Sequence, residues 1–288
     1  MNISMLPHYG ISRLAGYLRK FSAGIENAAD LLEVIRGLTP AQRRLLQRNS
    51  VFADKHKGQP AFVIVNGPSL AQQDIMRLKD HITFCVSGFW KHEVVSIWQP
   101  TYYSLLDANF FNDSDATRAF YTSLNERIRT STFFLPLYRG FDAIQRHNFL
   151  PIERCQFVAS VGAGKSGVDL TNIVQSFAGV SAFALAQAIY MGCSPIYLLG
   201  FDHDYLANRG VDRHFYSGGT LPGHKMTNVP LGDRVPYDDE MRANLRLWEN
   251  YRLLKNEADR KGVQIFNATV GGYLDVFDRV DYHDLKFY

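Results

Sequence analysis

Short apolar runs that alternate with helix-forming segments are the feature that most constrains the fold of this chain. The runs are rich in β-branched and aromatic residues, as buried strands are. They are AFVIVN (61–66), ITFCVSG (82–88), PTYYSLLD (100–107), PIYLLGFD (195–202) and VQIFNAT (263–269). Helical spacing appears between them, in SLAQQDIMRLKD (69–80), DATRAFYTSLNERIR, VSAFALAQAIYMG and the long DDEMRANLRLWENYRLLKNEADRKG. This alternation predicts an α/β fold with a Rossmann-like, mostly parallel sheet.

The first 50 residues differ from the rest because their patterning is helical only. Leucines recur at helical spacing there, and Thr39 followed by Pro40 is a helix start signal. A basic polar connection, DKHKGQP, then leads to the first strand. We therefore predict an N-terminal helical extension over residues 1–55 and a Rossmann-like domain over residues 56–288.

Composition narrows the class of protein. Aromatic residues make up 13% of the 288, which fits a folded core, and a net charge of +3 gives no reason to expect a nucleic-acid partner. No run approaches the ~20 apolar residues of a membrane span. The N-terminus lacks the apolar core of a signal peptide, and the three cysteines form no CxxC pair. These features predict a cytoplasmic protein.

Residues 11–21 form a short basic amphipathic segment. Such a segment either packs on the domain, which is the commoner arrangement, or makes a peripheral contact with a partner or with the inner face of the membrane.

Polar residues follow the apolar runs. In an open parallel sheet the carboxyl ends of the strands share one edge, and ligands bind there. We therefore expect one binding site built from these ends. The residues are Asn66, Gly67, Pro68 and Ser69; Ser87 and Gly88; Asp107 and Asn109; Gly200, Asp202, His203 and Asp204; and Asn267 and Thr269.

The NGPS turn after the first run has two interpretations. Gly67 allows a phosphate to approach the backbone, and Ser69 is able to cap a following helix whose N-terminus favours an anion. A plain turn also needs only Asn-Gly and Pro. The turn alone does not decide between them.

A second glycine-rich segment, ASVGAGKSG (159–167), nearly matches the phosphate-binding pattern GxxxxGK[ST]. Ala159 stands where that pattern needs its first glycine, and Gly167 and Asp169 follow where a helix should run. We interpret the segment as an active-site loop carrying the basic Lys165.

The segment LLGFDHDYL is the densest polar cluster. Asp202, His203 and Asp204 suit a divalent metal, a ribose or a general base, or else Asp caps the turn and His belongs to the core. The glycine- and proline-rich stretch that follows resembles a lid. It brings further candidates: His214 and His224 as bases, and Tyr205, Tyr216, Arg213, Lys225 and Arg234 as phosphate ligands.

Several spaced motifs, taken in order, resemble a family of bacterial surface-polysaccharide proteins. They are NGPSL, ITFCVSG, QPTYYSLLD, IYLLGFDHDYL, HFY and IFNATVGGYLDVFDRVDY. The family carries the 6-hydroxymethylpterin diphosphokinase-like (MptE-like) domain, which also forms the core of the motility-associated flagellin glycosyltransferases. The resemblance covers roughly residues 50–288 and implies a nucleotide-sugar-binding catalytic domain.

The domain is more distantly similar to bacterial sialyltransferases that use CMP-activated sialic acid, which implies a sialyltransferase-like GT-A variant of the fold. By this likeness Asn66, Gly67 and Ser69 hold the donor phosphate, and Ser87 and Asp107 lie near the donor. Asp202 matches the acidic residue near the nucleotide. The catalytic base would be a histidine before the last long helix, for which His224 fits best.

Three functions follow. The leading one is a glycosyltransferase that moves a CMP-activated nonulosonate, such as sialic, pseudaminic or Kdo-type acid, onto a bacterial surface glycan or protein, and requires no cofactor. The second is an ATP-dependent 6-hydroxymethylpterin diphosphokinase, with Mg²⁺ on carboxylates such as Asp107, Asp202 and Asp204. The third is a non-enzymatic scaffold in envelope assembly.

Overall fold

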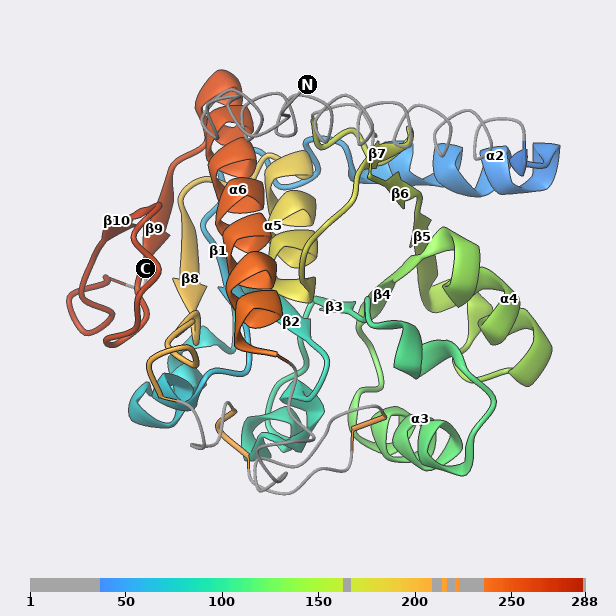
Figure 1. Ribbon diagram of the computed structural model, residues 1–288, viewed down its shortest axis with the longest axis horizontal. Helices are drawn as coiled ribbons and strands as arrows, with labels where there is room; N and C mark the ends of the chain where they lie inside the picture. The colour runs from blue at the N-terminus through green and yellow to red at the C-terminus, as the bar shows by residue number, and fades with distance from the viewer. Residues whose placement is uncertain (1–36, 163–166, 209–213, 217–220, 223–235, 287–288) are drawn as a thin grey trace, which may run out of the picture.

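An eight-stranded sheet forms the centre of the protein, in a computed structural model that describes residues 37–162, 167–208, 214–216, 221–222 and 236–286 (Figure 1). The strand order is β10-β9-β8-β1-β2-β3-β4-β5, and neighbouring strands pair in parallel. The predicted α/β fold with a Rossmann-like parallel sheet is confirmed. The strands are β1 (Ala61–Ile64), β2 (Ile82–Val86), β3 (Tyr102–Ser104), β4 (Thr132–Pro136), β5 (Cys155–Val158), β8 (Ile196–Leu199), β9 (Ile265–Asn267) and β10 (Asp278–Arg279).

Strand β1 lies in the middle of the sheet because its residues are apolar on both faces. Phe62 and Ile64 enter one hydrophobic cluster, and Ala61 and Val63 enter the cluster on the opposite face. All four are buried, as period-2 alternation between two covered faces requires.

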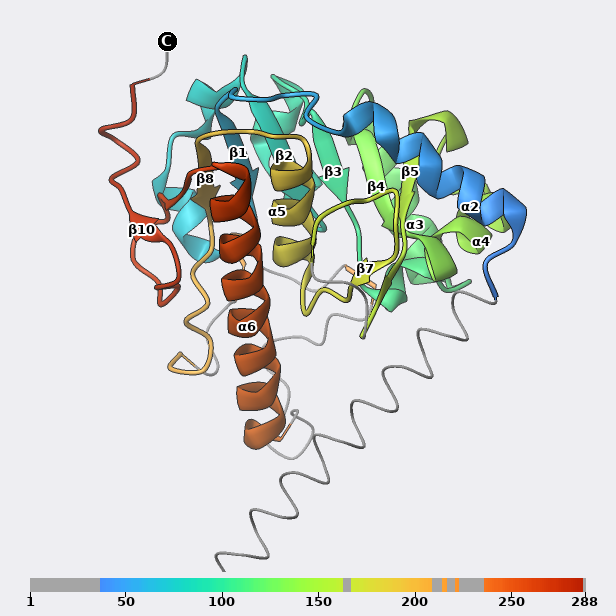
Figure 2. The ribbon, with the colours of Figure 1, turned by 90° about the horizontal axis from the view of Figure 1, so that it is seen from above.

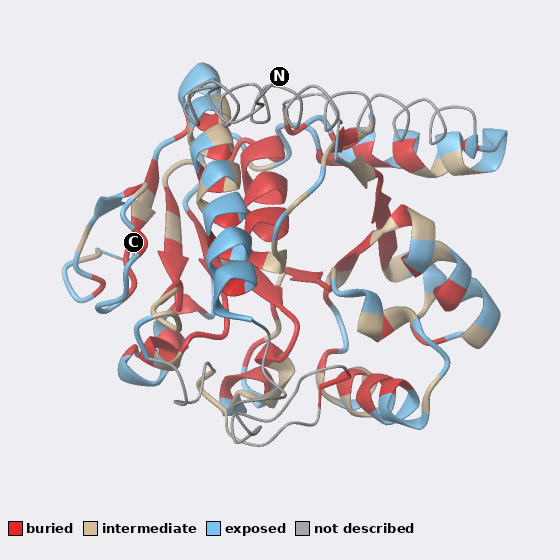
Figure 3. Cartoon of the chain, in the orientation of Figure 1, coloured by how far each residue is buried: buried red, intermediate tan, exposed pale blue. Residues whose placement is uncertain are grey.

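Helices cover both faces of the sheet. Helix α5 (Val180–Tyr190) is buried along almost its whole length, since it lies between the sheet and α6 (Tyr237–Lys261) (Figures 1 and 2). Helix α6 is amphipathic, with an exposed outer face (Figure 3). Helices α3 (Asp115–Arg127) and α4 (Leu137–His147) add to the cluster on the other face.

Part of the predicted N-terminal extension shares the core of the domain. It contains α2 (Pro40–Gln47), which begins with a Thr39 capping box, and the 3-10 helix η1 (Arg48–Phe52). Buried Asn49 donates to the carbonyls of Phe157 and Leu170, at 2.8 Å each. Residues 37–55 are therefore tied to the sheet. Residues 1–36, including the amphipathic segment 11–21, lie outside the described residues.

The helix predicted over residues 69–80 is wrong. The segment forms two 3-10 helices, η2 (Pro68–Gln72) and η3 (Ile75–Leu78). Gln73 between them is extended and donates to the Ala268 carbonyl at 2.8 Å, and the Asp74 side chain accepts from the Met76 amide at 3.1 Å. The Asp74 side chain thus caps η3 at a position where a continuous helix would have paired the Met76 amide with a backbone carbonyl. The remaining 3-10 helices are η4 (Phe89–Lys91), η5 (Glu93–Ser96), η6 (Ala108–Phe111) and η7 (Ile152–Arg154).

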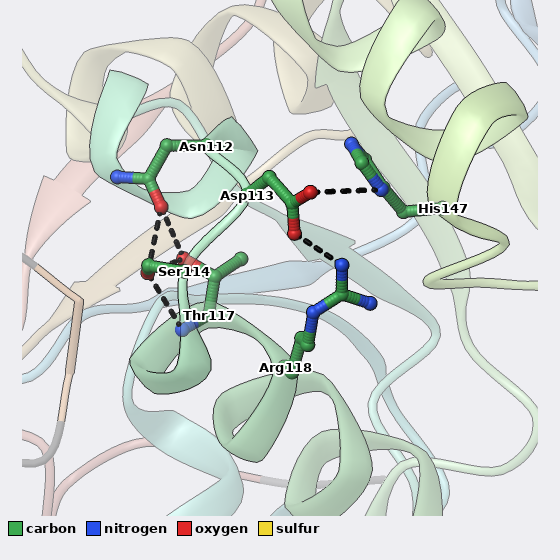
Figure 4. A network of polar contacts seen from close by, with 6 residues as sticks. All are labelled: Asn112, Asp113, Ser114, Thr117, Arg118 and His147. Atoms are coloured by element: carbon green, nitrogen blue, oxygen red, sulfur yellow. Dashed lines mark hydrogen bonds and ion pairs between the residues drawn. The ribbon is translucent and has the colours of Figure 1, made fainter.

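A polar network at the start of α3 fixes the loop that follows β3 (Figure 4). Ser114 caps the helix by accepting from the Thr117 amide at 3.2 Å, and Thr117 Oγ1 donates to the Asn109 carbonyl at 3.2 Å. Asp113 pairs with Arg118 and lies 3.8 Å from His147 Nδ1 of α4. The network thus holds η6 and the neighbouring Asp107 in place.

The glycine-rich segment after β5 does not lead into a helix. Strand β6 (Ser160–Val161) pairs in parallel with β7 (Val174–Gln175) as a separate two-stranded sheet. Residues 167–179 contain no helix, although Lys165 itself lies outside the described residues. Within the described part of the chain, no helix is both long and apolar enough to cross a membrane.

Candidate functional site

A cavity of about 350 Å³ lies where the direction of strand addition reverses. The chain builds β1 to β5 outward on one side of β1, then returns to place β8 on the other side. Ligands of open α/β sheets bind at such a switch point. The cavity is lined by Val65, Asn66, Gly67, Val86, Ser87, Leu106, Asp107, Phe110, Ala178, Gly179, Val180, Ser181, His203, His214 and Tyr216.

Seven of the predicted site residues line this cavity: Asn66, Gly67, Ser87, Asp107, His203, His214 and Tyr216. The other described candidates do not line it: Pro68, Ser69, Gly88, Asn109, Gly200, Asp202, Asp204, Tyr205, Asn267 and Thr269. His224 lies outside the described residues, as do Arg213, Lys225 and Arg234.

Ser69 and Asp202 bind each other and thereby join the ends of β1 and β8. The Ser69 amide donates to Asp202 Oδ1 at 3.0 Å, and its hydroxyl donates to Oδ2 at 2.7 Å. Both residues are buried, and burial raises the pKa of Asp202 although the Ser69 hydrogen bonds oppose that rise. Asp202 therefore organises the switch point from behind the cavity wall.

Glycine is required at positions 67 and 200 by close packing of the two strand ends. A Cβ on Gly67 would lie 1.8 Å from Asp202 Oδ2 and 2.2 Å from the Gly200 carbonyl oxygen. Gly200 itself has a φ of +73° and backs onto the Val65 carbonyl. The Asn-Gly-Pro-Ser turn thus has a structural role that explains its glycine.

The amides of that turn are already used within the protein. Gly67 donates to the Gly200 carbonyl at 3.0 Å, Ser69 donates to Asp202, and Leu70 donates to the Gly67 carbonyl at 3.1 Å. Pro68 has no amide hydrogen. The Gly67, Ser69 and Leu70 amides thus have partners within the protein, and the phosphate-binding role that the resemblance implies for this turn stays a prediction.

The N-terminus of α5 offers another anion site. Ala178, Gly179, Val180 and Ser181 line the cavity, and no side chain among the described residues caps the helix at Gly179. The first amides of a helix have no intrahelical partner and carry the positive end of its dipole. The sequence predicts this helix, and its N-terminus was not among the expected site residues; the Gly179 that precedes its first apolar turn was the available signal.

Two lining residues have strained backbones. Ser87 (φ +43°) and His203 (φ +48°) occupy the left-handed region without being glycine. Ser87 is held there because its carbonyl accepts from the Tyr103 hydroxyl at 2.8 Å and its amide donates to the Ser104 carbonyl at 3.1 Å. Such strain clusters at functional sites, where the surrounding structure maintains it.

A buried hydroxyl chain connects His203 to the N-terminus of α5. His203 Nε2 lies 2.8 Å from the Tyr251 hydroxyl, which lies 2.6 Å from the Ser181 hydroxyl. Tyr251 is fully buried. Burial lowers the pKa of His203 to about 4, against a weaker raising effect of Asp204. His203 is therefore neutral at pH 7, with its ring orientation fixed by Tyr251.

Residues 214–216 close over the strand ends. The Phe215 amide donates to the Asn66 carbonyl at 2.9 Å, and the ring of His214 stacks on that of Tyr216 at 5.0 Å. A Cβ on Gly88 would lie 2.3 Å from Tyr216 Oη, so the glycine after β2 makes room for this ring. Burial raises the pKa of Tyr216, and its hydroxyl is a neutral donor.

Two buried polar atoms of the cavity wall have no hydrogen-bond partner among the described residues. They are Asn66 Oδ1 and Tyr216 Oη. Asn66 is oriented by its Nδ2, which donates to the Val86 carbonyl at 3.2 Å. Buried polar atoms are nearly always paired, so these two are suited to bind a ligand.

The carboxylates predicted to hold Mg²⁺ do not come together. Asp107 lines the cavity and accepts from the Asn109 amide and side chain at 2.9 Å, whereas Asp204 accepts from Asn208 at 2.7 Å. Asp202 is bound to Ser69. In the ranges that the structure describes, no three His, Cys, Asp or Glu side chains gather as a metal site would require.

Comparison with known proteins extends the fold assignment. No family model matches the chain, and no curated protein matches it by sequence. The MptE-like membership therefore stays a prediction. Among solved structures, the chain is similar to the MAf glycosyltransferase from Magnetospirillum magneticum AMB-1, with 14% identity and a TM-score of 0.51. The match covers 85% of this chain but only 39% of that protein, so the chain spans about two fifths of its length.

A second similar structure is the sialyltransferase CST-II, solved with a trisaccharide acceptor and CMP. It shares 12% identity, covers 80% of this chain and 89% of that one, and has a TM-score of 0.45. The similarity to the MAf glycosyltransferase, at 14% identity, concerns the fold alone and agrees with the Rossmann-like sheet described above.

Proposed function

We propose that the protein is a glycosyltransferase that binds a nucleotide-activated sugar in the cavity at the switch point. The observation that carries the proposal is the convergence of the uncapped α5 N-terminus, two unpaired polar atoms and a neutral histidine on that cavity. The fold shared with the MAf glycosyltransferase is consistent with it.

The donor phosphate binds at the N-terminus of α5. There the helix amides, the Ser181 hydroxyl and the Tyr216 hydroxyl supply donors to the charge that develops as the sugar leaves. Asn66 and Asp107, at the ends of β1 and β3, provide an acceptor and a carboxylate for the nucleoside.

A single phosphate fits this wall better than a triphosphate. None of the described lining residues is lysine or arginine. One helix N-terminus carries about half a positive charge, which suits a nucleoside monophosphate leaving group and not the several charges of ATP. This favours a CMP-linked sugar, as the resemblance implies, over the diphosphokinase reaction.

The proposed general base is His203. Its ring is held by Tyr251 through Nε2, and it lies in the cavity wall with the α5 N-terminus, where an acceptor hydroxyl can reach it. His214, the other described histidine in the wall, stacks on Tyr216 and closes the cavity. In the reaction the acceptor oxygen attacks the anomeric carbon, its proton passes to His203, and the bond to the phosphate oxygen breaks.

The remaining assignments follow from the resemblance alone. The acceptor would be a bacterial surface glycan or glycoprotein, and the protein would act in the cytoplasm or at the inner face of the membrane.

Nucleotide release from activated sugars tests the proposal. The full chain is incubated separately with CMP-, UDP- and GDP-linked sugars and with ATP, with and without Mg²⁺. We expect slow release of CMP from a CMP-linked sugar, tolerant of metal chelation, and its loss in Ser181→Val. Reaction with ATP only when Mg²⁺ is present would contradict the proposal and support the diphosphokinase.

A further inference from the structure

A second cavity of about 410 Å³ opens beside the first and shares His203 with it. Its other walls come from the outer face of α6 and from the loops after β8 and β9. The lining residues are His203, Leu206, Ala207, Asn244, Leu245, Trp248, Arg252 and Tyr273. Apart from His203, none of these residues has a role in the donor site proposed for the first cavity.

One buried polar atom in this second cavity lacks a partner. Asn244 is 6% exposed, and its Nδ2 donates to the Glu240 carbonyl at 2.7 Å. That bond leaves Oδ1 as the acceptor, and it has no hydrogen-bond partner among the described residues. A ligand hydroxyl in the cavity would satisfy it.

Two aromatic rings line the second cavity, and hydrogen bonds fix the segments that carry them. The Trp248 indole is held by a 2.9 Å hydrogen bond to Asp275, and it lies 5.5 Å from the ring of His203. Tyr273 is 60% exposed, yet its amide donates to the Asp202 carbonyl at 2.8 Å. Arg279 binds the carbonyls of Gly271 and Gly272, which keeps the Tyr273 loop in place.

We propose that this second cavity is the acceptor subsite and that it binds a sugar residue of a glycan. The inference rests on the proposed function, because the shared His203 then stands between donor and acceptor. An apolar sugar face packs on the rings of Trp248 and Tyr273, while sugar hydroxyls bind Asn244 Oδ1 and the Arg252 guanidinium.

The surrounding charge argues for a sugar over other occupants. Asp238, Asp239 and Glu240 form the acidic first turn of α6, about one turn before Asn244. Asp238 is paired with Arg242, and Arg252 is the one lysine or arginine among the described lining residues, which is too little positive charge for a polyanion such as a nucleic acid. A lipid chain would leave Asn244 Oδ1 unpaired, at the cost of a buried polar group. Rigid aromatic faces with a few placed polar groups suit a saccharide.

Binding to a glycan array, with a serine- and threonine-containing peptide array beside it, tests the subsite. The full chain is applied with saturating CMP, as are Asn244→Leu and Trp248→Leu. Arg246→Leu is the control, because Arg246 is exposed on the same helix and lines neither cavity. Thermal stabilisation by CMP is measured for each variant, so that the donor site is followed separately.

We expect the chain to bind one or more glycans, and binding to weaken about tenfold or more in both cavity variants, as losing a buried hydrogen bond or ring contact predicts. Arg246→Leu and the CMP stabilisation should be unchanged. Glycan binding that neither cavity variant weakens, binding to peptides in its place, or no binding to either array would overturn the assignment. Glycan binding that depends on Asn244 in a protein that CMP fails to stabilise would keep the subsite and refute the CMP donor.

Discussion

Removing the Ser69 hydroxyl should weaken the junction between β1 and β8 by an amount that the structure sets. Ser69→Ala deletes the 2.7 Å hydrogen bond to Asp202 Oδ2 and keeps the 3.0 Å bond from the Ser69 amide to Oδ1. The two residues are 3% and 7% exposed, so solvent cannot replace the lost donor without rearrangement. A hydrogen bond to a charged group contributes about 1.5–3 kcal/mol, and we expect the free energy of unfolding to fall by that amount.

Urea unfolding at pH 7 measures this change in the free energy of unfolding. The dependence of that free energy on urea concentration should be the same in the variant and the unchanged protein. Ser96→Ala is a matched control, because its exposed hydroxyl donates to the Glu93 carbonyl within η5 at the same 2.7 Å. We expect the control to change stability by less than about 0.5 kcal/mol.

Asp202→Asn completes a double-mutant cycle with Ser69→Ala and isolates the energy of this pair. A Ser69→Ala loss no larger than the control, or a cycle with no coupling, would show that the pair does not hold the two strand ends together.

Three further predictions concern the same site. Gly67→Ala should lower the free energy of unfolding in urea by more than about 3 kcal/mol, because its Cβ would lie 1.8 Å from Asp202 Oδ2. A stability close to that of the unchanged protein would contradict the close packing of the turn. Gly88→Ala should displace Tyr216, because the new Cβ would lie 2.3 Å from the Tyr216 hydroxyl. Titration calorimetry should then find the affinity for CMP about tenfold lower, and an equal affinity would show that Tyr216 does not bind the nucleotide. His203 has a folded pKa of about 4, below the ordinary 6.5, so its contribution to stability is present above pH 6.5 and is lost as the pH falls through 4. The free energy of unfolding, measured in urea between pH 4 and 6.5, should therefore rise with pH by up to ~1.4 kcal/mol per pH unit, and this dependence should flatten in His203→Gln. An unaltered pH dependence in the variant would refute the assignment.

The fold, and the edge of the sheet at which the candidate cavity lies, could be predicted from the sequence because both depend on local patterns. Strand β1 and its polar exit are visible as AFVIVN followed by a turn, and parallel strands must end at a common edge. Asn66, Ser87 and Asp107 were predicted for this reason, since each comes within three residues of the end of its strand, and all three line the cavity.

The contacts of each residue in the candidate site could not be predicted from the sequence, because they join residues that are far apart along the chain. Ser69 and Asp202 are 133 positions apart, and their mutual hydrogen bonds give the Ser69 amide and hydroxyl a partner within the protein. The α5 N-terminus at Gly179 enters the site only through the return of the chain to β8. The prediction of one helix over 69–80 was wrong for the same reason, since the Gln73 side chain donates to a carbonyl 195 positions away along the chain.

Thermal stabilisation by nucleotides tests most directly the claim that the cavity at the switch point binds an activated-sugar donor. The full chain and Ser181→Val are each melted with CMP, CDP, UDP, GDP or ATP, with and without Mg²⁺. We expect CMP to raise the melting temperature, with a shift that persists in a metal chelator and is lost in Ser181→Val. A shift with ATP that requires Mg²⁺, or a CMP shift that Ser181→Val leaves intact, would contradict it.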